Sequence, residues 1–111
     1  MGATLNKRRS ARQPVVMQAE CRTQTGMFGR VDIIDLTAEG CRIFAKGLPM
    51  RVGQRLRLRP QNFQPIPGIV RWAGNDFAGV EFESALYLPV VEHLQRQFAP
   101  RGGVRQEDPL L

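Results

Sequence analysis

Two short polar segments hold the residues best suited to chemistry, and the first lies near the N-terminus. Its residues Lys7, Arg8, Arg9 and Arg12 place four positive charges within six residues, before any acidic residue appears. An arginine guanidinium binds phosphate oxygens, or the two acceptors on the Hoogsteen edge of guanine, with paired hydrogen bonds. The cluster therefore predicts an anionic partner, in agreement with the net charge of +6.

The second segment reads Asp35-Leu36-Thr37-Ala38-Glu39-Gly40. A carboxylate such as that of Asp35 is a strong hydrogen-bond acceptor. The same segment also fits a plain hairpin connection, in which Asp35 and Thr37 cap backbone amides and Gly40 takes a left-handed conformation. Taken alone, the segment leaves a binding role and a structural role open.

The other residues that carry chemistry do not form a catalytic or metal site. No pair of acidic residues has a spacing suited to acid/base catalysis, and His93 has no obvious serine or cysteine partner. Cys21 and Cys41 lack the CxxC spacing of a metal knuckle, so we expect them to be reduced and buried. Neither the GxGxxG nor the GxxxxGKS/T nucleotide pattern occurs. The chain is therefore predicted to be no enzyme and to hold neither a metal nor a cofactor.

Length and composition indicate one small folded domain. The chain has 111 residues, of which 42% are hydrophobic and 23% charged. The N-terminus has no apolar stretch of signal-peptide length, and no run approaches the roughly 20 apolar residues that span a bilayer. We therefore expect a cytoplasmic protein that does not enter a membrane.

Alternation of apolar and polar residues predicts six short strands. They cover residues 14–22, 31–34, 41–44, 54–59, 66–72 and 77–82. Gly26 and Gly29 are expected to bracket the first turn, and Asn75 and Asp76 suit a turn with positive φ before the last strand. Six strands at this spacing predict a mainly β fold, a closed or nearly closed antiparallel barrel.

One α-helix is predicted after the strands. Pro89 suits the first helical turn, and one face at helical spacing carries Val90, Val91, Leu94 and Phe98. The barrel and this helix are expected to occupy residues 13–99. Residues 1–12 are expected to form a flexible basic arm, and residues 100–111 a disordered tail.

Two features of the predicted strands have both a structural and a functional interpretation. A single tryptophan on a strand of a small barrel belongs to the core more often than it forms a stacking platform, so Trp72 is expected to be buried. Arg55, Arg57 and Arg59 alternate with leucines and form a basic stripe on the outer face. Solvation is the default for this stripe, and an acidic partner is the alternative.

The two polar segments, in this order and ahead of a six-stranded pattern, resemble the motifs of the PilZ domain family. Arg8 and Arg12 match the family's RxxxR motif. The family's (D/N)xSxxG motif is matched by Asp35, Thr37 and Gly40. Threonine stands where the family has serine, which keeps the hydroxyl and adds a methyl group. The likeness continues into the later strands and covers about residues 6–98.

The resemblance implies a receptor for the bacterial messenger cyclic di-GMP, which carries two phosphates and two guanines. In the family, the arginines of RxxxR wrap the ligand, and the second motif holds a guanine against the barrel. Arg8 and Arg12 would take the first role, with Arg9 sharing the phosphate contacts. The second role would fall to Asp35, Thr37 and Gly40. Ligand binding is expected to order the arm and to create a surface for an unidentified downstream protein.

Two other functions fit part of the sequence. A degenerate PilZ adaptor would act through protein contacts without nucleotide, but the retained Arg8, Arg12 and Asp35 argue against that loss. A small basic barrel would bind RNA or single-stranded DNA, which the pI of about 10.6 favours. That function requires aromatic rings exposed on the sheet, whereas most of the six phenylalanines fall on positions expected to be buried. Nucleic acid is therefore the weaker alternative.

Overall fold

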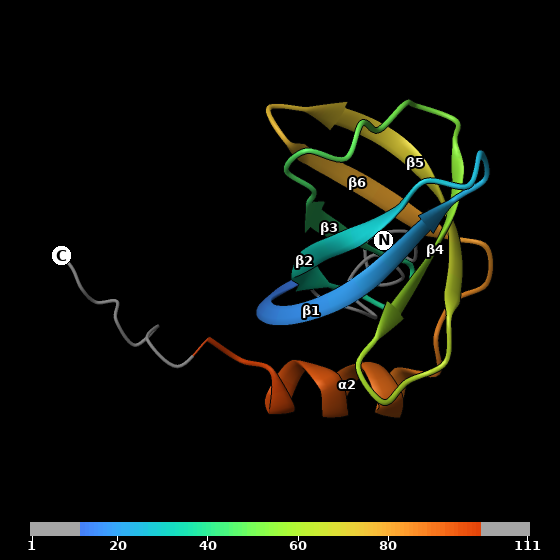
Figure 1. Cartoon of the computed structure of the whole chain (residues 1–111). Coiled ribbons are helices and arrows are strands. Elements are labelled where there is room, and N and C mark those ends of the chain that lie inside the picture. Colours follow the sequence, from blue (N-terminus) through green and yellow to red (C-terminus); the bar gives the residue numbers. More distant parts are fainter. Residues whose placement is uncertain (1–11, 101–111) are drawn as a thin grey trace, which may run out of the picture.

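The computed structural model describes residues 12–100, and its dominant feature is one antiparallel sheet closed into a barrel (Figure 1). The strands are β1 (Gln13–Thr23), β2 (Phe28–Leu36), β3 (Gly40–Phe44), β4 (Arg55–Pro60), β5 (Ile66–Gly74) and β6 (Phe77–Phe82). Around the barrel they follow the order β1-β2-β3-β6-β5-β4. The predicted six-stranded barrel is confirmed. The expected arm and tail lie outside the described residues, except for Arg12 and Pro100.

The strands form where apolar and polar residues alternate, because one face of each strand is buried inside the barrel. In β4, Leu56 and Leu58 are buried, whereas Arg55, Arg57 and Arg59 lie on the outer face. β1 follows the same rule, with buried side chains at Val15, Met17, Ala19 and Cys21. The predicted alternation of these two strands is confirmed.

Two turns show where the sequence pattern is reliable and where it is not. Asn75 and Asp76 have φ angles of 54° and 69°, which confirms the predicted turn between β5 and β6. The first turn is shorter than predicted, because β2 begins at Phe28 and takes in Gly29. Gly29 pairs with Cys21 of β1, so only Gly26, with a φ of 96°, belongs to the turn.

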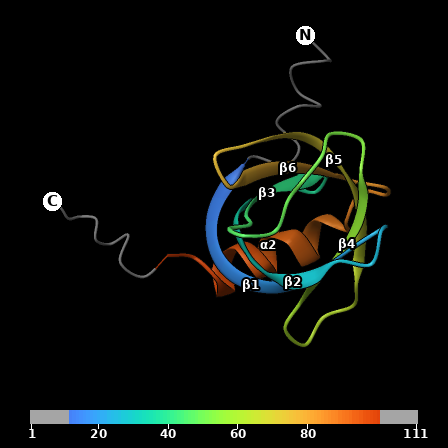
Figure 2. The same ribbon diagram turned by 45° about the horizontal axis from the view of Figure 1, so that its top comes forward.

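The helix α2 (Leu88–Gln97) lies across one end of the barrel (Figure 2). Pro89 stands in its first turn, as predicted, and Val91 and Leu94 are buried against the core. Its C-terminal end is fastened to β1 and β2 by hydrogen bonds. The Gln95 side-chain amide donates to the Leu36 carbonyl at 2.9 Å, and the Val16 amide donates to the Phe98 carbonyl at 2.8 Å. The helix therefore closes an opening that would otherwise expose the core.

Both cysteines belong to the core and are free thiols, as predicted. Burial raises the pKa of the Cys21 thiol to about 11. Burial, with a smaller contribution from the Asp35 carboxylate, raises the pKa of Cys41 still further. Neither thiol is therefore activated as a nucleophile at neutral pH.

Gly40, at the start of β3, is needed for close packing and not for an unusual backbone angle. It pairs with Glu81 of β6, and a Cβ at this position would overlap the carbonyl oxygen of Val80. The expected left-handed conformation is wrong, because the described glycines with positive φ are Gly26, Gly47 and Gly53. The contact between β3 and β6 is what excludes a side chain at Gly40.

Replacing Gly40 with alanine should destabilise the barrel by about 2 kcal/mol or more, because the Val80 backbone cannot move without disturbing the β3–β6 pairing. Gly74→Ala is the matched control, since nothing lies within 4 Å of a Cβ there. Its unfolding free energy in urea should stay within about 0.5 kcal/mol of the unmodified chain. Equal effects of the two substitutions would contradict this account of Gly40.

Candidate functional site

The candidate site is organised around the carboxylate of Asp35, which lies near the end of β2 and is only 3% exposed. Its Oδ1 accepts a hydrogen bond from Nη1 of Arg12 at 2.7 Å and another from the backbone amide of Arg42 at 3.1 Å. Nε of Arg42 lies 3.0 Å from the other oxygen, Oδ2. The two arginine side chains are themselves 60% and 47% exposed. One buried negative charge thus holds two arginines at the barrel surface.

The two oxygens of Asp35 are not equally satisfied. Among the described residues, Oδ2 has no partner with hydrogen-bond geometry, although Nε of Arg42 is close enough for an ion pair. A buried carboxylate is costly unless its charge is compensated, and here the compensation comes from Arg12 and Arg42. The position of both side chains therefore depends on Asp35.

Thr37 closes the loop that follows β2. Its buried hydroxyl oxygen accepts hydrogen bonds from the amides of Glu39 and Gly40, at 3.1 and 3.0 Å. The hydroxyl also donates to the Gly40 carbonyl at 3.2 Å. The expected capping role of Thr37 is confirmed, and Asp35 caps the amide of Arg42 in the same way. The polar group at position 37 fixes the loop, so serine and threonine are equivalent in this role.

A shallow concavity lies beside this loop on the outer side of β3, β5 and β6. Its lining combines arginines, glutamates, backbone and one indole, and includes Arg12, Thr37, Glu39, Gly40, Arg71, Trp72 and Glu81. Arg71 and Glu81 form a 2.6 Å ion pair across it. The structure thus brings together four of the predicted site residues, namely Arg12, Asp35, Thr37 and Gly40. The other two, Arg8 and Arg9, lie outside the described residues.

Trp72 is not a core residue, so the expectation that it is buried is wrong. The side chain is 45% exposed and lines the concavity. The pairing of β5 with β6 shifts between Val70 and Trp72, which breaks the alternation and leaves Arg71 and Trp72 both on the outside. The indole covers Gly79 of β6, where a Cβ would overlap the ring. The lack of a side chain at Gly79 on β6 therefore makes room for the Trp72 ring of the neighbouring strand β5.

Arg42 is the other site residue that the sequence reading missed. It stands on β3 directly opposite Asp35 in the β2–β3 pairing. Its closeness to Asp35 could have been predicted, because a hairpin between the predicted strands at 31–34 and 41–44 brings positions 35 and 42 close together. The pairing shift between Ile33 and Asp35 fixes the actual partner.

The site places the exposed arginines Arg12 and Arg42 near an exposed indole, groups that can contact an anion with planar rings, although Glu39 and Glu81 also line the concavity. In residues 12–100, no group of three or more His, Cys, Asp and Glu side chains is arranged to hold a metal ion. No helix in this part of the chain is long and apolar enough to cross a membrane.

Comparison with known proteins agrees with this architecture. The structure is similar to that of the Bacillus subtilis inhibitor of motility MotI/DgrA, with a TM-score of 0.60 and 17% sequence identity. The similarity covers 89% of this chain and 52% of MotI/DgrA, so this chain spans about half the length of that protein. At this identity the likeness concerns the fold alone. A search of the curated proteins gives no match.

The family comparison covers the motif segments as well as the barrel. The model of the PilZ domain matches residues 6–99, a range that contains Arg8 and Arg12 together with the Asp35–Gly40 loop. Because this match spans most of the chain, the protein belongs to the PilZ domain family.

Proposed function

We propose that this chain is a non-enzymatic receptor that binds cyclic di-GMP over the concavity on β3, β5 and β6. PilZ domains are receptor or adaptor domains, so the family supports the class of function. The main support for cyclic di-GMP as the ligand is the Arg12–Asp35–Arg42 cluster, which lies beside an exposed indole. Arg8 and Arg9 precede Arg12 in the chain and would add further guanidinium groups to the same ligand.

The ligand phosphates are assigned to the arginines. Arg12 is 60% exposed while its Nη1 is bonded to Asp35, and within residues 12–100 its other N–H donors have no partner that would keep them from a ligand. Hydrogen bonds between charged partners are roughly twice as strong as neutral ones. A guanidinium already held in place loses less conformational freedom on binding than a free one. Asp35 therefore contributes by holding its arginines ready.

The burial of Asp35 supports one of two roles for its carboxylate. A guanine would reach Oδ2 only if Arg12 or Arg42 first moved aside, because that oxygen has almost no exposed surface. The side chain as a whole is 4% exposed. We therefore assign Asp35 a positioning role toward the arginines, in place of the direct guanine contact that the family resemblance implies.

A guanine base is assigned to Trp72. Stacking of a nucleic-acid base on an aromatic side chain contributes about 1–3 kcal/mol. The indole borders the same concavity as Arg12 and Gly40 and is fixed from below by Gly79. A ligand with two phosphates and two guanines can thus contact the arginines and the Trp72 ring at the same time.

The output of the receptor would follow from the N-terminal segment. Residues 1–12 carry Arg8, Arg9 and Arg12, so a ligand that binds these arginines also fixes that segment against the barrel. The covered barrel wall would then form a new surface for a downstream protein. A receptor for an internal messenger acts in the cytoplasm, which is the localisation we propose.

The aromatic residues argue for a nucleotide site rather than a nucleic-acid groove. The expectation that most phenylalanines are buried is wrong, because Phe82 alone is buried, while Phe28 and Phe77 are exposed and the other three are half-buried. Each exposed ring has a neighbour, however, because Arg22 lies over the ring of Phe28 and the Phe77 ring is 5.1 Å from that of Phe44. Phe28 on β2 and Phe77 on β6 are not on neighbouring strands, so these two exposed rings do not form the row of platforms that single strands require.

Calorimetric titration with cyclic di-GMP tests the assignment of the arginines. The chain of residues 1–111 should bind saturably, and Arg12→Ala should weaken binding at least about tenfold, because a charge-assisted contact is lost. Arg96→Ala on α2 is the control and should change affinity less than about twofold. The proposal is wrong if there is no saturable binding, or if Arg8→Ala combined with Arg12→Ala leaves the affinity unchanged.

Fluorescence of the single tryptophan tests the stacking assignment. Cyclic di-GMP should change the emission of Trp72 with the same saturation curve that calorimetry gives, because a stacked guanine alters the indole environment. Trp72→Ala should lower the affinity about tenfold, whereas Trp72→Phe should retain most of it. Binding without any change in emission, and with normal affinity in Trp72→Ala, would place the guanine elsewhere. Competition by RNA that collapses with added salt would instead favour a nucleic-acid function.

A further inference from the structure

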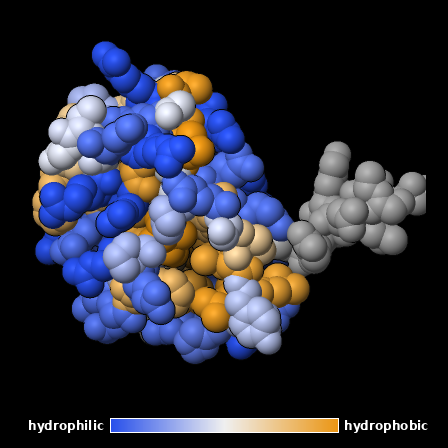
Figure 3. Space-filling view, turned by 90° about the vertical axis from the view of Figure 1, so that its right-hand side faces the viewer, coloured by the Kyte–Doolittle hydropathy of each residue, from blue (hydrophilic) through white to orange (hydrophobic). Residues whose placement is uncertain are grey.

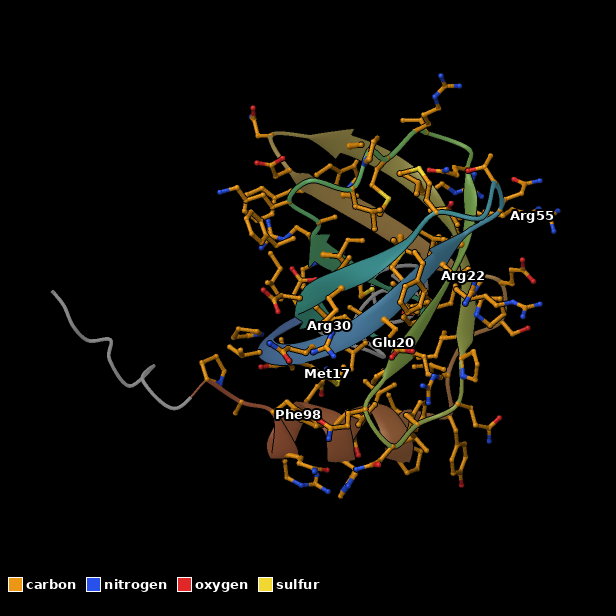
Figure 4. All side chains as sticks on the ribbon, in the orientation of Figure 1. Met17, Glu20, Arg22, Arg30, Arg55 and Phe98 are labelled. Carbon is orange, nitrogen blue, oxygen red and sulfur yellow. The ribbon has the colours of Figure 1, made fainter. Side chains whose placement is uncertain are left out.

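The outer face of β1, β2 and β4 carries arginines that the candidate nucleotide site does not use. We call them the arginine face, and they are Arg22, Arg30, Arg55, Arg57 and Arg59. Figure 4 shows Arg22 and Arg30 beside β1 and β2 on the near side of the barrel, with Arg55 at its edge. In the closed strand order, β1 lies across from β6 and β4 across from β3. The arginine face is therefore on the wall opposite the concavity.

Arg22 and Arg57 form the centre of the arginine face. They are direct partners in the β1–β4 pairing, and like charges directly opposite each other destabilise a sheet. Their outer neighbours in the same row are Phe28 and Pro67, which offer no charge to either of them. Among the described residues, neither arginine forms an ion pair, although Arg22 lies 5.0 Å from the centre of the Phe28 ring. Two positive charges thus face each other without a neutralising partner in residues 12–100.

The neighbouring row of residues across β2, β1 and β4 also has more positive than negative charges. Glu20 of β1 stands between Arg30 of β2 and Arg59 of β4 in the two pairings. The Glu20 carboxylate forms an ion pair with Arg59 at 3.0 Å. Arg30 forms no ion pair within the described part of the chain. The remaining arginine, Arg55, is only loosely paired, with Nη1 at 3.6 Å from Glu83. The face therefore carries excess positive charge at fixed positions.

The shape of the surface allows a partner to engage these charges. A shallow concavity between β1, β4 and the start of β5 is lined by Arg22, Thr23, Gln24, Arg55, Arg57 and Pro67, among others. Figure 3 looks onto the β4 side and shows mainly hydrophilic residues over its upper part, with hydrophobic ones gathered lower down. An extended chain with charged side chains fits such a surface better than a compact apolar ligand does.

We propose that the arginine face binds an acidic segment of a partner protein, whose carboxylates pair with Arg22, Arg30 and Arg57. The guanidinium fork matches a carboxylate with two parallel hydrogen bonds. Glu20 and Glu83 interrupt the positive surface, which disfavours a uniformly charged phosphate backbone. One face of the Phe28 ring is already occupied by Arg22, which disfavours stacking of a base there. Because the face is opposite the concavity, the partner binds whether or not nucleotide is present.

Fluorescence anisotropy with a fluorescein-labelled peptide of about ten glutamates tests this proposal on the chain of residues 1–111. Arg57→Glu should weaken peptide binding at least about fivefold, because it reverses the charge at the centre of the face. Lys46→Glu, on an exposed lysine in the β3–β4 connection, makes the same change in net charge and should cost less than about twofold. Equal losses in the two variants would show non-specific attraction and overturn the proposal.

Folding of the test variant can be checked independently. Arg57→Glu places a negative charge opposite Arg22 and so replaces repulsion across β1 and β4 with attraction. The thermal unfolding midpoint of this variant should therefore rise by about 2 °C while its peptide binding weakens. An oligonucleotide of equal charge should bind more weakly than the peptide, and saturating cyclic di-GMP should leave the peptide affinity unchanged. Tighter binding of the oligonucleotide, or displacement of the peptide by cyclic di-GMP, would overturn the proposal.

Discussion

The burial of one carboxylate, that of Asp35, is the constraint on which the candidate site depends. Removing a charge from water is costly unless opposite charges compensate it nearby. Asp35 meets this requirement with the guanidinium groups of Arg12 and Arg42 and with the Arg42 amide. The compensation links the start of β1, the end of β2 and the middle of β3. A requirement of folding thereby fixes two cations on the outer wall, where a ligand can use them.

Closure of the barrel gives the chain two separate outer walls. One wall carries the shallow concavity, where Gly40 lets β3 approach β6 and Gly79 lies under Trp72. The opposite wall carries the arginine face, with charges spaced by the β1–β4 register. The aliphatic core and α2 hold the walls at a constant distance. In this account, the nucleotide and the acidic partner of the arginine face bind different surfaces of one small domain, and that partner's surface is distinct from the one that ligand binding creates.

Most of the fold could be predicted from the sequence, because alternation is a local property. The regular Arg55–Arg59 segment predicts β4 with the correct face inward, and Pro89 predicts the start of α2. Trp72 was predicted wrongly because a shift in the β5–β6 register moves it to the outside. Such a shift depends on which residues face each other across strands, which one chain's alternation does not reveal. The left-handed conformation predicted for Gly40 was wrong for a similar reason. Its close neighbour Val80 is distant in the sequence, so the contact between them could not be read from the local pattern.

The motif residues could be found from the sequence, but their roles required the structure. The Thr37 hydroxyl is engaged within its own loop, and Asp35 faces arginines instead of open solvent. Calorimetry of cyclic di-GMP binding to Asp35→Asn is the most direct test of this central claim, because the substitution keeps the side chain's shape and removes its charge. The account predicts a folded barrel with affinity reduced at least about tenfold. Unchanged affinity in a folded Asp35→Asn chain would contradict it.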